Sequence, residues 1–82
     1  MQRIQKFIIV PYHSVKGRLQ QAELRRASSE EAAMRLAETL SARYAAVAAF
    51  EVLVDVETGE MHDPRELVAY GPMPLVHDAM VA

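Results

Sequence analysis

One stretch of ten residues holds the densest group of side chains that could do chemistry. It runs from Asp55 to Pro64, reads DVETGEMHDP, and contains the carboxylates and imidazole of Asp55, Glu57, Glu60, His62 and Asp63. Such groups serve as metal ligands and as general acids or bases. A structural interpretation is also open, because Gly59 supplies the positive φ that a hairpin loop needs and Asp55 can accept backbone N–H groups there.

Neither common metal template fits this stretch. A calcium-binding EF-hand loop needs glycine at its sixth position and a bidentate glutamate at its twelfth, with further oxygen ligands between. Counted from Asp55, glycine is fifth, and Glu66 is twelfth without those ligands. A zinc site needs several histidines or cysteines, and only His62 is available here. We therefore predict a structural hairpin over residues 55–63, with no metal or other cofactor.

Two further pairs, His13-Ser14 and His77-Asp78, place an imidazole beside a hydroxyl or a carboxylate. Adjacent residues rarely face each other productively, and no glycine elbow flanks Ser14. The three glycines, at positions 17, 59 and 71, stand too far apart to form a phosphate-binding loop. The sequence therefore predicts a protein that is not an enzyme.

Length and composition predict a small soluble domain. A chain of 82 residues forms one domain and buries only about 60% of the surface that its unfolded form exposes, so its core is marginal. It contains no cysteine, which fits a reducing compartment, and we expect the cytoplasm. No apolar run approaches the roughly 20 residues of a membrane span, and no signal peptide is recognisable.

Charge is distributed unevenly along the chain. Residues 51–82 contain seven acidic residues and one basic residue, whereas residues 1–26 contain one acidic residue, Glu23, and six basic ones: Arg3, Lys6, Lys16, Arg18, Arg25 and Arg26. Strand pairing within the chain, or docking onto a second copy, would bring these opposite charges together. Nucleic-acid binding through Lys6, Lys16, Arg18, Arg25 and Arg26, near Tyr12, is an alternative that the net charge of -2 does not favour.

The elements that position these residues are predicted from periodicity and caps. Lys6–Tyr12 reads as a strand with Pro11 at its end or at an edge, and Leu19–Ala27 as an extended connection or a second short ladder. Ser28, followed three residues later by Glu31, predicts a helix N-cap. The helix extends to about Arg43 or Tyr44 on an alanine-rich apolar face made of Ala33, Leu36, Ala37, Leu40 and Tyr44.

Two more strands and a tail complete the predicted domain. In Val47–Val56, Phe50, Val52 and Val54 share one face, whereas Leu53 lies on the other. A returning strand covers Glu66–Tyr70 after an irregular Met61–Pro64. The prediction is an α+β domain over residues 1–74, with the order β-α-β-β and a three-stranded sheet under one helix. Residues 75–82 form a tail, with a possible short helix.

Several segments of the chain together resemble a family of short, mostly alphaproteobacterial β-α-β-β proteins of unknown function. They are Phe7–Tyr12, Gly17–Leu19, Ser28–Glu38, Ala48–Phe50, Glu57–Glu60, Asp63-Pro64 and Leu67–Gly71. The resemblance covers residues 6–74 and implies a three-stranded sheet with one packed helix, but no activity. The chain departs from the family at Ala45 or Ala46, where glycine is expected after the helix, and in its longer tail.

The predicted function is that of a non-catalytic interaction module that binds another protein or a second copy of itself. One helix covers one face of the sheet, so we expect Leu53, Val68 and Tyr70 on the second face or at an edge, where apolar surface invites a partner. The apolar tail residues Leu75, Val76 and Met80 join this partner-binding set, and we expect a homodimer. A bacterial or mobile-element accessory protein that binds nucleic acid is the alternative. Metal binding, or flavin binding by analogy with the topology of dodecin-like proteins, is less favoured, because no Trp is present to stack on a flavin ring.

Overall fold

The structure, a computed structural model, describes residues 2–72. It confirms a small α+β fold with one helix and an antiparallel sheet, but within residues 2–72 the sheet has five strands rather than the predicted three. The elements are β1 (Arg3–Val15), β2 (Arg18–Gln21), β3 (Arg25–Ala27), α1 (Glu30–Leu40), β4 (Ala46–Asp55) and β5 (Met61–Tyr70). The predicted tail over residues 75–82 lies outside the described residues.

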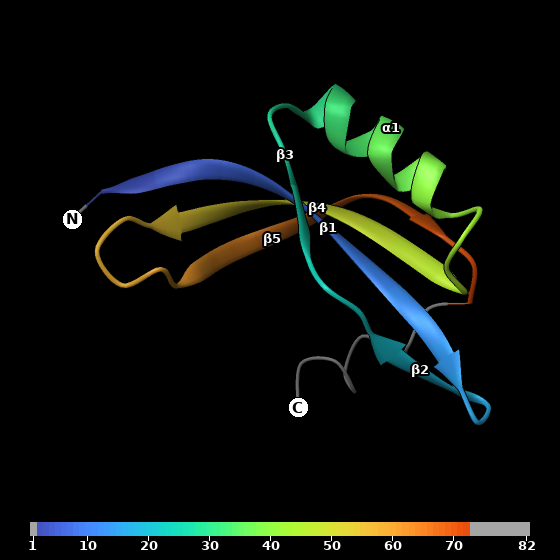
Figure 1. Ribbon diagram of the computed structural model, residues 1–82. Coiled ribbons are helices and arrows are strands. Elements are labelled where there is room, and N and C mark those ends of the chain that lie inside the picture. The colour runs from blue at the N-terminus through green and yellow to red at the C-terminus, as the bar shows by residue number, and fades with distance from the viewer. Residues whose placement is uncertain (1, 73–82) are drawn as a thin grey trace.

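The sheet is built around β1 and β4, which form its longest ladder. The strand order is β2-β1-β4-β5, and β3 pairs with β1 on the same side as β2. The β1–β4 ladder runs without interruption from Arg3 opposite Asp55 to Tyr12 opposite Ala46. The β4–β5 hairpin therefore lies beside the N-terminal end of β1, whereas α1 covers the other half of the sheet (Figure 1).

Pro11 explains why the chain beside β1 is divided into two strands. Its carbonyl accepts a 2.8 Å hydrogen bond from the amide of Ala22, in the gap between β2 and β3. The N–H and C=O of one strand residue point the same way, so the donor that proline lacks would also face this gap. The prediction that Pro11 ends the strand or lies at an edge is wrong, because Pro11 is fully buried within β1.

The helix begins and ends close to the predicted residues, with a different cap. The hydroxyl of Ser29, not of Ser28, accepts a 3.1 Å hydrogen bond from the amide of Ala32. Glu31, which would close a capping box with Ser28, instead forms an ion pair with Arg35. The helix stops at Leu40, earlier than predicted, and the chain turns there.

The main core lies between α1 and the sheet. It is formed by Ile9, Ala33, Ala37, Leu40, Val47 and Ala49. Ala33 and Ala37 of the helix and Ala49 of β4 are fully buried in it, so the predicted alanine-rich helix face does cover the sheet. Val68 and Tyr70 pack against this same core. Both residues lie on the edge strand β5, one of the two predicted placements, but on the helix side rather than on the second face.

The opposite face of the sheet has a smaller apolar cluster. Ile8, Val10 and Val52 are buried there, with Tyr12, Phe50 and Val54 packed against them. Because β4 alternates regularly, Leu53 lies on the helix side with Val47 and Ala49, not on the second face as predicted. Both faces of β4 are apolar near its centre, so alternation alone could not show which one the helix covers.

Candidate functional site

The predicted hairpin forms between β4 and β5, and Asp55 anchors its turn. Asp55 is 5% exposed, and its Oδ1 accepts hydrogen bonds from the amides of Glu57 at 2.8 Å and Thr58 at 3.2 Å. The amide of Gly59, with a φ of +79°, donates to the carbonyl of Asp55 at 2.8 Å. The bond from Glu57, followed by that from Thr58, lowers the pKa of Asp55. Asp55 thus holds the turn as a carboxylate.

The other polar groups of this stretch do not converge. Glu57, Glu60 and Asp63 are exposed, and the one close approach is 3.9 Å between Nε2 of His62 and Oε1 of Glu60. Among residues 2–72, no group of three or more His, Cys, Asp or Glu side chains is arranged to hold a metal ion. The carboxylate of Asp55 is the most buried of these groups, and it is already hydrogen-bonded to the backbone of the turn.

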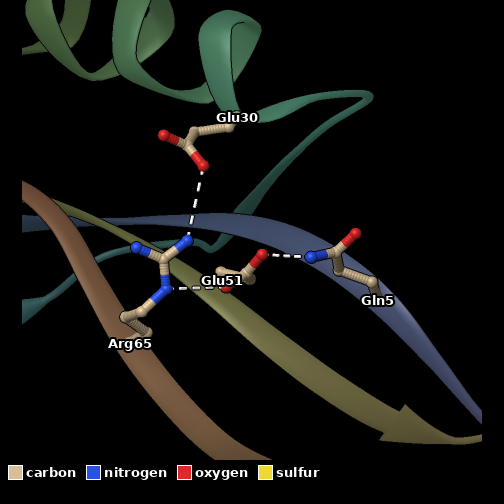
Figure 2. Close-up of polar contacts among 4 residues, drawn as sticks. All are labelled: Gln5, Glu30, Glu51 and Arg65. Atoms are coloured by element: carbon tan, nitrogen blue, oxygen red, sulfur yellow. Dashed lines mark hydrogen bonds and ion pairs between the residues drawn. The ribbon is translucent and has the colours of Figure 1, made fainter.

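A four-residue polar cluster joins three strands to the start of α1 (Figure 2). Arg65 of β5 donates from Nε to Oε1 of Glu51 at 2.8 Å, and its Nη2 lies 3.4 Å from Oε1 of Glu30. The second oxygen of Glu51 accepts from the amide nitrogen of Gln5 on β1. The guanidinium therefore bridges two carboxylates, one from the sheet and one from the first turn of the helix.

The electrostatics of this cluster indicate a structural role. The side chain of Glu51 is only 19% exposed, and the hydrogen bond from Arg65 is the largest cause that lowers its pKa. The same bond raises the pKa of the Arg65 guanidinium. Both groups are therefore held in their charged forms. We did not predict this cluster, although Arg65 stands out as the one basic residue among the acidic residues 51–82.

The residues around His13 do not assemble a nucleophile and its base. His13 lies with its ring centroid 4.9 Å from that of Tyr44, at an interplanar angle of 42°. Ser14 is the next residue of β1, so alternation places its side chain on the other face of the sheet. His77 and Asp78 lie outside the described residues.

The predicted nucleic-acid residues are placed in separate parts of the sheet. Lys16 and Arg18 lie at the β1–β2 turn, and Arg25 is on the helix side of β3, opposite Ile9. Arg26 is opposite Ile8 and shares a face with Lys6. Among the described residues, no ion pair joins the basic first segment to the acidic last one, since the ion pairs there involve Arg35, His62 and Arg65. Strand pairing does bring Arg3 opposite Asp55, and the charge of Arg3 is among the causes that lower the pKa of Asp55.

The strongest candidate for an interaction surface is the sheet face opposite α1, which we call the outer face. Ile4 of β1 is opposite Val54 of β4, which is opposite Met61 of β5. Ile4 is 40% exposed and Met61 50% exposed, and nearby Val56 is 48% exposed. Contiguous exposed apolar patches are a feature of interaction sites, which makes this face the candidate.

The sequence predicted a partner on this second face of the sheet, but with other residues. Of the predicted partner-binding residues, Leu53 is half-buried on the helix side and Tyr70 packs against the main core. Leu75, Val76 and Met80 lie outside the described residues. In the sequence, the outer face could have been found from apolar residues that recur at even-numbered positions of the two strands: Ile4, Ile8, Val10, Val52 and Val54.

Comparisons with protein-family models, with curated proteins and with solved structures find no match. No helix within residues 2–72 has the length and apolar character needed to cross a membrane. The function is therefore inferred from the geometry of the chain itself.

Proposed function

We propose that the protein is a non-catalytic interaction module that self-associates through the outer face of its sheet. The observation that carries the proposal is the apolar row of Ile4, Val54 and Met61 across three neighbouring strands, in which Ile4 and Met61 are exposed and Val54 is half-buried. Full burial of one such side chain stabilises by about 1.5–3 kcal/mol relative to full exposure. In a two-fold dimer, both copies would bury the partly exposed side chains of this row.

The small size of the domain favours a second copy as the partner. A chain of 82 residues has a marginal core, and the face of α1 that covers it contributes mainly alanine. Two sheets can pack face to face about 10 Å apart with their apolar side chains interdigitated. Two-fold dimers are the commonest closed assemblies. Dimerisation would therefore complete a second hydrophobic core on the outer face.

The non-catalytic part of the proposal rests on the roles of the constrained polar groups. Asp55 holds the hairpin turn, and Glu51 is engaged by Arg65 and Gln5. Both carboxylates have a structural explanation, and the pKa of each is lowered rather than raised toward neutrality. The absence of cysteine fits a cytoplasmic location.

Matched charge insertions test the face. Met61→Lys places a cation in the apolar row, whereas Met34→Lys places one on α1, where Met34 is 39% exposed. We expect light scattering to show a dimer for the unmodified chain and for Met34→Lys, and a monomer for Met61→Lys at the same concentration. A dimer that survives Met61→Lys and Ile4→Lys, with circular dichroism unchanged, would exclude this face as the interface.

Nucleic-acid binding is the second candidate, favoured by one observation. Lys6 and Arg26 share the outer face at neighbouring positions, and neither forms an ion pair with another described residue. If self-association is the function, labelled single-stranded RNA or DNA will bind only weakly, and physiological salt will abolish the binding. Tight binding that persists at physiological salt and is lost in Arg26→Gln would favour the nucleic-acid function instead.

A further inference from the structure

A row of four residues crosses the outer face at the level of Ile8. The register places Arg26 of β3 opposite Ile8 of β1, Ile8 opposite Phe50 of β4, and Phe50 opposite Glu66 of β5. Paired residues of neighbouring strands share a face. The row therefore reads basic, apolar, apolar, acidic. Arg26 and Glu66 are exposed, Phe50 is half-buried and Ile8 is buried.

The two charged ends of this row are separated by the apolar residues between them. Neighbouring strands lie about 4.8 Å apart, so three spacings put the backbones of Arg26 and Glu66 roughly 14 Å from each other. Among the described residues, neither side chain forms an ion pair. Lys6, two residues before Ile8 on β1, adds a second positive charge on the β3 side of the same face. The face thus carries positive charge toward one edge and negative charge toward the other.

This charge pattern distinguishes between two ways of stacking the face on its own copy. A two-fold axis perpendicular to the strands, in the plane of the interface, would put β3 over β3 and β5 over β5. Arg26 would then face Arg26 and Glu66 would face Glu66. A two-fold axis parallel to the strands reverses the strand order, so that β3 of each copy lies over β5 of the other. Opposite charges then meet at both ends of the row.

We infer that, given the proposed self-association, the outer face pairs with a second copy about a two-fold axis parallel to the strands. Arg26 of each copy lies over Glu66 of the other, and the apolar residues of the two central strands, Ile4 and Ile8 of β1 and Phe50 and Val54 of β4, pack between the two charged rims. An apolar centre with a polar rim is the usual anatomy of a protein interface. The two Arg26–Glu66 contacts set the orientation of the dimer rather than supply most of its affinity.

The mixed charge of the face favours a second copy over other occupants. A nucleic acid attracted by Lys6 and Arg26 would meet the carboxylate of Glu66 in the same row, and this carboxylate repels phosphate. A purely acidic or purely basic partner would match only one end of the row. The face is complementary to itself, because each end supplies the charge that the other end needs.

Charge exchange tests the orientation. In Arg26→Glu, four carboxylates would occupy the two rims of the dimer, and in Glu66→Arg four guanidinium groups would do so. We expect each variant alone to have a dimer dissociation constant raised at least about tenfold. An equimolar mixture of the two variants should recover affinity close to that of the unmodified chain, as a one-to-one heterodimer in native mass spectrometry. The doubly exchanged chain should again form homodimers.

Arg25→Glu is the matched control, because Arg25 is adjacent in β3 but lies on the helix side, opposite Ile9. It should leave the dissociation constant unchanged, and circular dichroism should show that all variants are folded. The inference is overturned if the unmodified chain dimerises but the mixture shows no recovery, or if Arg25→Glu weakens the dimer as much as Arg26→Glu does. Truncation after Pro74 that alone abolishes the dimer would identify residues 75–82 as the contact instead. A monomeric unmodified chain would contradict the self-association itself.

Discussion

Arg65 and Glu51 are joined across the β4–β5 ladder by a hydrogen bond of 2.8 Å, and Arg65 also approaches Glu30 at 3.4 Å at the start of α1. Arg65→Met keeps much of the apolar stem but removes the charge that holds the half-buried Glu51 carboxylate. We expect the melting temperature to fall by several degrees at pH 7. Differential scanning calorimetry measures this change.

Arg35→Met is the control for that variant. Arg35 pairs with Glu31 on the helix surface, where the two side chains are 70% and 85% exposed, and such surface pairs contribute little. Its melting temperature should therefore stay close to that of the unmodified chain. Equal losses in the two variants would show that the cluster around Arg65 has no special structural role.

Two glycines with the same φ predict different costs on substitution. Gly59 and Gly71 both have a φ of +79°, which a residue with a Cβ adopts only with strain. An added Cβ at Gly59 meets open space, whereas at Gly71 it would overlap the carbonyl oxygen of Ala45 and lie 3.2 Å from the Cα of Ala46. Gly59→Ala should cost roughly 1 kcal/mol in unfolding free energy, and Gly71→Ala clearly more. Urea denaturation measures the unfolding free energy of both variants. An equal or smaller loss for Gly71→Ala would contradict the close contact between the end of β5 and the start of β4.

The helix cap predicts a second contrast between neighbouring residues. Ser29→Ala removes the hydroxyl that accepts from the amide of Ala32 and should destabilise the protein by about 1 kcal/mol. Ser28→Ala should have an effect within about 0.5 kcal/mol, because Ser28 is exposed and does not cap the helix. Chemical denaturation of both variants measures the difference. A larger loss for Ser28→Ala would restore the cap that the sequence predicted.

The turn carboxylate predicts a pH dependence. The pKa of Asp55 in the folded protein lies below its ordinary value of 3.8, chiefly because of the hydrogen bond from the amide of Glu57. Because the pKa of Asp55 is lower in the folded than in the unfolded protein, its ionised form stabilises the fold. This stabilisation is complete at pH values above the unfolded-state pKa and is lost as the pH falls through the folded-state pKa. The melting temperature should therefore fall below about pH 4, and less steeply in Asp55→Asn, which still offers an oxygen to the amides. Glu57→Gln is the control from the same turn, and an acid dependence equal in Asp55→Asn and the unmodified chain would refute this role for Asp55.

Local patterns were sufficient to predict the elements that local interactions determine. Gly59 and Asp55 predicted the hairpin because both act within the turn itself. The helix was predicted from its alanine and leucine spacing, although Ser29 rather than Ser28 caps it. The α+β class followed from these elements.

Features that depend on the register between distant strands were not predicted. β2 and β3 are short and polar. β2 pairs with the C-terminal end of β1, from Tyr12 to Val15, whereas β3 pairs with Phe7–Ile9 in its apolar centre. The irregular segment around Pro64 is part of β5, which follows β4 through two register shifts. The cluster of Gln5, Glu30, Glu51 and Arg65 requires that register, as does the row from Arg26 to Glu66. Neither arrangement has a signature within any one segment.

The association state of the unmodified chain tests the central claim most directly. Sedimentation equilibrium at tens of micromolar and physiological salt should give twice the chain mass of 9.2 kDa, with dissociation to monomers on dilution. The chain mass itself, unchanged over the whole concentration range, would contradict self-association through the outer face.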